Sequence, residues 1–121
     1  MMSAFTDFLA RHRQLIARLG IAFVLLYAGI ESLLIPENWI GWVPDWVGRF
    51  IDRSTFLTLH GILEIAVGGV LLLNRYVFWG ALFLALDMVG VVVANGVDAV
   101  TFRDIGLLAL ALVLAGLSKE E

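Results

Sequence analysis

Four long apolar blocks fill most of this chain and limit its fold more than any other feature. They cover residues 15–35, 55–73, 76–97 and 99–117. Each is close to the ~20 residues that an α-helix needs to cross the hydrocarbon core of a bilayer. The connections between the blocks are short enough to make neighbouring helices antiparallel. We therefore predict an all-α integral membrane four-helix bundle, with residues 1–121 in a single transmembrane domain.

The composition supports a lipid bilayer as the main partner of the chain. Hydrophobic residues make up 61% and charged residues 16% of the sequence, whereas soluble domains hold about 45–50% and about 25%. The absence of cysteine excludes thiol chemistry and cysteine-ligated clusters. A net charge of −3 gives no basic surface for binding nucleic acid, so nucleic acid is excluded as a partner.

The connection between the first two blocks is rich in tryptophan. Trp39, Trp42 and Trp46 recur at helix-like intervals, and Pro44 suits a first helical turn. Tryptophan favours the boundary between membrane and water. We therefore expect a short interfacial amphipathic helix over about residues 38–52, in the first outer loop. A second surface helix is expected before the first block.

Basic residues set the expected orientation of the bundle. By the positive-inside rule, the side with more Lys and Arg faces the cytoplasm. We therefore expect a multi-pass protein of the cell (plasma) membrane with both termini cytoplasmic and the tryptophan-rich loop outside. The richer side holds Arg11, Arg13, Arg18, Arg75 and Lys119, and the other side holds Arg49, Arg53 and Arg103.

Small residues at four-residue spacing are expected where helices touch, because they let the backbones approach closely. Such pairs are Ala81/Ala85, Gly90/Ala94 and Ala111/Ala115, with Gly61, Gly68 and Gly69 on the second predicted span.

Every predicted span carries ionisable residues in its middle or outer half. A charge at the bilayer centre costs about 2.5–3.5 kcal/mol, so such groups are expected to face the bundle interior and find partners. These residues predict a ligand or proton-relay pocket, without a catalytic residue set and without a metal. They are Glu31, His60, Glu64, Asp87, Arg103 and Asp104.

The spacing and charge of these residues sharpen the expectation. His60 and Glu64 are four residues apart, which places them on one helix face, one turn apart. The set contains four acids, one obligate cation in Arg103 and one conditional cation in His60. Burying surplus negative charge is unfavourable. We expect a carboxyl group to be protonated, or a cation or hydrogen-bond donor on a ligand to compensate.

Several of these residues also have a purely structural explanation. Thr101-x-x-Asp104 reads as a capping box. Arg103 can extend its side chain to the interface, Glu31 lies near enough to the surface for water, and His60 can be a buried packing residue. A di-iron site would require a second Glu-x-x-His motif, and the predicted spans contain only one histidine.

Three stretches carry a resemblance to a known family. They are RLGIAFVLLYAGIESLLIPENW (Arg18–Trp39), GILEIAVGG (Gly61–Gly69) and RDIGLLAL (Arg103–Leu110). In order, spacing and topology the chain resembles the DoxX/DoxD-like family of small four-helix membrane proteins. DoxD-type members are subunits of thiosulfate:quinone oxidoreductases, and some DoxX members associate with oxidoreductases. Family members commonly carry a lysine where this chain has Glu31-Ser32, so a role that uses that lysine does not transfer.

The resemblance implies an accessory or quinone-interacting subunit of a membrane redox complex. A quinone is the cofactor it implies, and oxidoreductase subunits are the partners that would supply electrons. His60 and Glu64 would hydrogen-bond a quinone carbonyl or relay its protons. Alone, the chain is not expected to be an enzyme. Two alternatives stay open: a small homo-oligomeric proton-linked transporter, which needs an oligomer because one four-helix unit is small for alternating access, and a structural membrane subunit.

Overall fold

The computed structural model describes residues 2–96 and 102–119, and this part of the chain contains helices and turns but no strand. The all-α prediction is confirmed for it. The α-helices are α1 (Met2–Arg11), α2 (Arg13–Leu34), α3 (Arg53–Leu72), α4 (Val77–Asn95) and α5 (Phe102–Lys119). Three short 3-10 helices connect α2 to α3: η1 (Pro36–Asn38), η2 (Ile40–Trp42) and η3 (Asp45–Arg49).

Three of the helices, α2, α3 and α4, are long and apolar enough to cross a membrane. The first three predicted spans are therefore confirmed in length and composition. The fourth block forms helix α5, but α5 is not among the helices apolar enough to span. Its 18 residues include Arg103, Asp104 and Lys119, so its crossing of the membrane stays a prediction.

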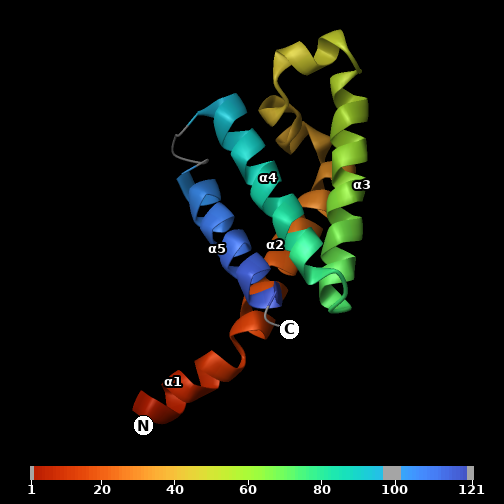
Figure 1. Cartoon of the computed structure of the whole chain (residues 1–121). Helices are drawn as coiled ribbons and strands as arrows, with labels where there is room; N and C mark the ends of the chain where they lie inside the picture. The colour runs from red at the N-terminus through yellow and green to blue at the C-terminus, as the bar shows by residue number, and fades with distance from the viewer. Residues whose placement is uncertain (1, 97–101, 120–121) are drawn as a thin grey trace.

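The bundle consists of two closely packed helix pairs, and the contacts between the two pairs are less extensive (Figure 1). Helix α2 packs along α3, and α4 packs along α5, whereas α3 and α4 touch over a shorter stretch. We call the end that carries η1–η3 the loop end, and the opposite end, where α2 begins and α3 turns into α4, the terminal end. Helix α1 projects from the terminal end and buries no residue.

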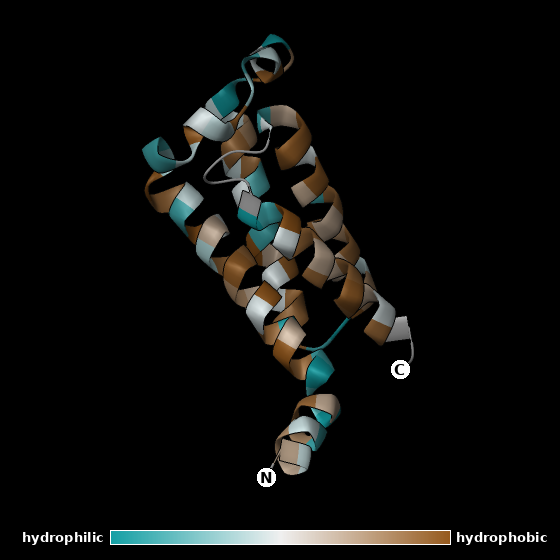
Figure 2. Ribbon diagram, turned by 90° about the vertical axis from the view of Figure 1, so that its left-hand side faces the viewer, coloured by the Kyte–Doolittle hydropathy of each residue, from teal (hydrophilic) through white to brown (hydrophobic). Residues whose placement is uncertain are grey.

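The hydrophobic core fills the terminal half of the bundle. Large side chains from α2, α3 and α4, among them Leu25, Leu71 and Leu84, are fully buried. The predicted small pairs Ala81/Ala85 and Ala111/Ala115 lie in the same core and let α4 and α5 approach closely. Figure 2 shows hydrophobic residues over most of α2 to α5, and hydrophilic ones gathered mainly at the loop end and on α1.

Helices α2 and α3 cross closely because glycines face each other. A Cβ atom on Gly29 would lie 2.7 Å from the backbone oxygen of Gly61, and one on Gly61 would lie 3.1 Å from that of Gly29. The Ser32 hydroxyl donates to the Ala28 carbonyl at 2.7 Å and so leaves no unpaired donor at this crossing. The crossing fixes the face that α3 turns toward the rest of the bundle.

Arg18 joins the start of α2 to the end of α3. Its Nη1 donates to the carbonyls of Leu71 at 2.7 Å and of Leu72 at 3.2 Å. These carbonyls belong to the last turn of α3, where the regular helical N–H donors run out, and the Leu71 carbonyl also accepts from the Asn74 N–H at 3.1 Å. A cation is also favourable at a helix C-terminus. Arg18 is only 8% exposed. It therefore stabilises the bundle from inside, in addition to the role in membrane orientation expected from the sequence.

The connection between α2 and α3 is not one amphipathic α-helix, so the predicted interfacial helix over 38–52 is not confirmed. Pro44 adopts an extended conformation (ψ 146°) between η2 and η3 and has no N–H for a helix ladder. Arg53 instead binds the carbonyls of Ile40 and Val43 at 2.8 and 2.7 Å. Val43, Val47 and Leu57 form a small apolar cluster that holds the connection against α3.

Candidate functional site

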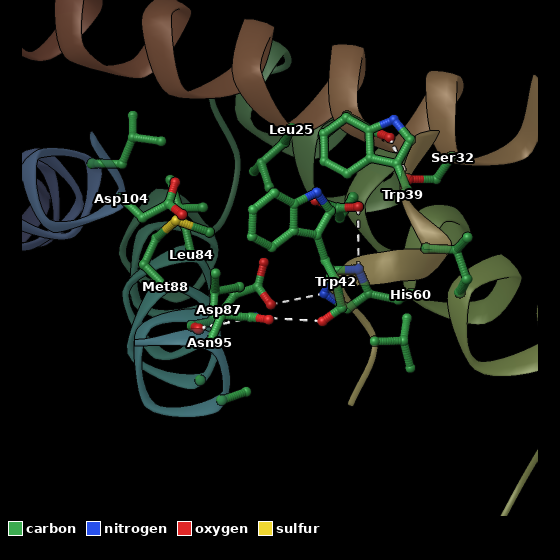
Figure 3. A pocket seen from close by; sticks show the side chains of 18 of the residues that line it. Leu25, Ser32, Trp39, Trp42, His60, Leu84, Asp87, Met88, Asn95 and Asp104 are labelled. Atoms are coloured by element: carbon green, nitrogen blue, oxygen red, sulfur yellow. Dashed lines mark hydrogen bonds and ion pairs between the residues drawn. The ribbon is translucent and has the colours of Figure 1, made fainter. Parts of the chain in front are cut away.

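A cavity of about 1330 Å³ opens in the loop half, between the two helix pairs. Its walls come from α2, α3, α4 and α5, and the connection with η1–η3 covers it. Figure 3 shows its polar side chains converging from these separate elements. Leu25, Leu84 and Met88, all buried, form the floor toward the terminal half.

All six ionisable residues singled out in the sequence border this one cavity. Helix α2 contributes one of them, α3 two, α4 one and α5 two. The structure thus brings them together, and three of them, on α3 and α4, are bonded directly to one another. They are Glu31, His60, Glu64, Asp87, Arg103 and Asp104.

His60, Glu64 and Asp87 form a bonded cluster, and we refer to these three residues as the histidine cluster. His60 Nδ1 lies 3.2 Å from Glu64 Oε1, and His60 Nε2 lies 2.7 Å from Asp87 Oδ1. Both bonds involve side chains that are mostly buried, with exposed fractions of 26% for His60, 8% for Glu64 and 14% for Asp87. The i,i+4 pair predicted on α3 is therefore present and is joined by the acid of α4.

Local sequence explains why α3 presents these two side chains to the cavity. Asp52 caps the helix by accepting the Thr55 N–H at 3.2 Å, which sets the start of α3 two turns before His60. Phe56 stacks on the His60 ring with a centroid distance of 6.0 Å and an interplanar angle of 18°. Gly61 turns the neighbouring face toward α2, so His60 and Glu64 face α4.

The cluster can hold its shared protons in two ways. Either the imidazole is protonated and donates from both nitrogens to two carboxylates, or it is neutral and one carboxylic acid donates to a ring nitrogen. Both arrangements contain the same number of protons and have the same net charge of −1. A proton can therefore pass between His60 and Asp87 along the 2.7 Å bond without any side-chain movement.

Glu31 lies on the opposite wall and has a different partner. Its Oε1 accepts the indole N–H of Trp39 at 3.0 Å, which ties η1 and η2 back to α2. The side chain is neither fully buried nor fully exposed. Glu31 thus holds part of the cover of the cavity in place and does not contact the histidine cluster directly.

Arg103 and Asp104 supply the charges on the α5 wall. Asp104 is buried and Arg103 is exposed, although both border the cavity. Thr101, the other half of the predicted capping box, lies outside the described residues. That structural explanation of Asp104 therefore stays a prediction.

Two polar residues that hold the cover were missed in the sequence. Asn95, at the end of α4, donates to the Trp42 carbonyl at 3.4 Å and to the Val91 carbonyl at 3.1 Å. Arg53 binds the carbonyls of the connection from α3. A polar residue at the end of an apolar block was the only available signal for Asn95, and Arg53 was counted only for orientation.

Aromatic and aliphatic side chains supply most of the remaining lining. The indoles of Trp39, Trp42 and Trp46 lie in the cover, and Phe56 lies on the α3 wall. Aromatic faces favour flat rings in offset or edge-on arrangements. A large, mainly apolar cavity with a few convergent polar groups is typical of a small-molecule site.

The histidine cluster also has the donor types that divalent metal ions accept. One ligand atom each from His60, Glu64 and Asp87 can be chosen so that all lie within 4.8 Å of one another. However, the two carboxylates face different nitrogens on opposite edges of the imidazole ring. A metal on one nitrogen would reach the carboxylate on that edge, and the other carboxylate would have to move. The observed arrangement fits shared protons better than a shared metal.

The spanning helices, the buried charges and the cavity together define a multi-pass helical membrane protein with a polar site between its helices. The match to a family model is more specific: the DoxX model matches residues 13–96, and the chain belongs to the DoxX family. The match includes α2, α3 and α4 with four of the six site residues, but it ends before Arg103 and Asp104. No curated protein and no solved structure matches the chain significantly.

Proposed function

We propose that this DoxX protein is a quinone-interacting accessory subunit of a membrane redox complex. In this proposal α5 is the fourth span, and the protein lies in the plasma membrane with both termini in the cytoplasm. The cavity then opens near the outer face of the bilayer. Oxidoreductase subunits are the partners, because the chain has no redox-active group of its own and electrons have to come from elsewhere.

The observation that carries the proposal is the histidine cluster inside a large aromatic cavity. A quinone has a flat polar ring and an apolar tail, and a volume of about 1330 Å³ holds the ring and part of the tail. Trp42 and Phe56 offer ring faces beside His60. Quinone chemistry couples electrons to protons, and the His60–Asp87 bond can exchange a proton at the wall of the site.

The same cluster also fits proton-linked transport, which is the main alternative. Intramembrane acids mark proton paths as well as ligand sites. In this structure, however, buried side chains of Leu25, Leu84 and Leu114 fill the terminal half below the cavity. A proton path through one chain would have to cross that packed core. A homo-oligomer could supply another path, and a purely structural subunit would not need the cavity.

The test is to measure quinone retention in a variant of the cluster. Glu64→Gln keeps the size of the side chain but removes its charge and its ability to take up a proton. We expect the wild-type protein, extracted gently from its own membranes, to carry quinone in native mass spectrometry and the variant to lose it. Folding should be unchanged, as judged by circular dichroism and gel filtration.

A matched control separates the cavity from general charge effects. Glu37→Gln makes the same chemical change on the exposed η1, away from the cavity lining, and should retain quinone. Equal retention in both variants would contradict a quinone site at Glu64. A clean homo-oligomer without quinone or partner would instead favour the transporter, and proton-flux assays on Asp87→Asn would then decide.

A further inference from the structure

We infer that the cavity binds the reduced hydroquinone in preference to the oxidised quinone. This inference rests on the proposed function and adds the redox form of the ligand. A quinone carbonyl only accepts hydrogen bonds, whereas a hydroquinone hydroxyl donates one and accepts others. The hydrogen-bonding groups that remain available at the histidine cluster therefore decide between the two forms.

Within the cluster, every polar hydrogen is already used. If His60 is protonated, its two N–H groups donate to Glu64 and Asp87. If one acid holds the proton instead, its O–H donates to a ring nitrogen and the other ring N–H donates to the second carboxylate. In both arrangements the spare capacity consists of carboxyl oxygens, which are acceptors. A ligand group placed against them has to donate.

The neighbouring polar groups reinforce this preference. The donors of Trp39, Ser32 and Asn95 are directed to Glu31 and to backbone carbonyls. The acids Glu31 and Asp104 add further negative or acceptor groups to the lining.

Trp42, Trp46 and Arg103, whose side chains carry N–H donors, also line the cavity. A hydroxyl can accept from one of these donors and at the same time donate to the cluster, whereas a carbonyl can only accept. Leaving a polar group unpaired in a site with little water is unfavourable, so we expect the hydroquinone to bind about tenfold tighter or more.

The experiment compares three probes of nearly the same shape on the full chain in detergent. They are a decyl-substituted benzoquinone, its hydroquinone and the dimethyl ether of that hydroquinone. Equilibrium dialysis without oxygen, with quantification by chromatography, gives the dissociation constants. We expect the hydroquinone to bind at least about tenfold tighter than both other probes. For a two-electron couple, this preference shifts the midpoint potential of the bound quinone upward by about 30 mV.

Asp87→Asn provides the decisive variant, because an amide has nearly the same shape but places an N–H₂ group where a carboxyl oxygen was. The variant should bind the hydroquinone more weakly and so lose the preference. Glu37→Gln, an acid-to-amide change outside the cavity lining, should keep the wild-type preference. Circular dichroism of both variants checks that they fold.

The outcomes distinguish this inference from the proposed function. Equal binding of quinone and hydroquinone would refute the redox preference and leave a quinone site intact. Equal binding of the hydroquinone and its dimethyl ether would refute hydrogen-bond donation to the cluster as its cause. Failure of all three probes to bind would refute both. A preference that persists unchanged in Asp87→Asn would show that the histidine cluster is not its source.

Discussion

The two halves of the bundle are built from the same helices but differ in what lies between them. In the terminal half, large buried side chains such as Leu71 meet small ones such as Gly80, and Arg18 closes the end of α3. In the loop half, the same helices leave a cavity bordered by the histidine cluster. Packing in the terminal half fixes the positions of the helices, and this arrangement leaves room for the cavity in the loop half.

The two glycines of α4, one in each half of the bundle, have opposite roles. A Cβ atom on Gly80 would lie 2.8 Å from Leu71 Cδ2, so this glycine makes room for a neighbouring helix. A Cβ atom on Gly90, ten residues later on the same helix, would meet nothing within 4 Å. A glycine in a membrane helix can therefore lie at a close helix contact or beside a cavity. Which of the two applies depends on the position of the neighbouring helix.

The largest loss of stability is expected for Arg18→Met. The substitution removes the two charge-assisted hydrogen bonds to the Leu71 and Leu72 carbonyls, whereas the Asn74 N–H still donates to the Leu71 carbonyl at 3.1 Å. Hydrogen bonds to charged groups contribute about 1.5–3 kcal/mol, so the free energy of unfolding should fall by about 3 kcal/mol. Reversible unfolding in a titration with dodecyl sulfate measures it. Arg75→Met, at an exposed position, is the control, and an equal loss there would contradict the capping role.

The next largest effect is expected for Leu71→Ala. Lipid is as apolar as leucine, so the cost in a membrane comes from lost packing rather than from transfer out of water. The cavity left by a fully buried leucine should cost about 2 kcal/mol. The same titration should give less than about 0.5 kcal/mol for Leu86→Ala, because Leu86 is exposed beside the cavity. Equal losses would mean that the two halves are packed alike.

The sequence predicted the site better than it predicted the cover. Hydrophobic block lengths were sufficient for the helices, because few other structures satisfy backbone groups in lipid. The high cost of buried charge then placed His60, Glu64 and Asp87 in the interior, and the structure brings them to one cavity. The prediction of the helices and of the interior charges depends only on local composition and on the lipid that surrounds the helices.

The parts that could not be predicted depend on contacts between distant residues. Arg53 donates to the Ile40 carbonyl and Asn95 to the Trp42 carbonyl, and these bonds hold the 3-10 helices of the connection in place. The periodicity of the sequence does not predict them. The expected helix contact at Gly90/Ala94 was wrong at Gly90, which is exposed and borders the cavity. The pattern of small residues carries no information about the partner helix.

A smaller effect is expected for Gly80→Ala, which adds one methyl group to the packed half. The new Cβ would press on Leu71, which is fully buried and has little space to move. Overpacking of this size should cost about 1 kcal/mol. The double variant with Leu71→Ala should lose less than the sum, because each change relieves the other. Gly106→Ala, where a Cβ meets nothing within 4 Å, is the control and should be neutral. Strict additivity of the double variant would contradict the contact.

The smallest effect on stability, and the clearest separation of the two halves, is expected for Gly90→Phe. The position is exposed, borders the cavity and has no neighbour within 4 Å of a Cβ. The unfolding free energy should therefore change by less than about 0.5 kcal/mol. The phenyl ring would occupy space next to Asp87, so binding of the decyl-substituted hydroquinone should weaken about tenfold or more in the dialysis measurement. A variant that binds normally would place the ligand elsewhere. A variant that unfolds would show that the loop half is packed as tightly as the terminal half.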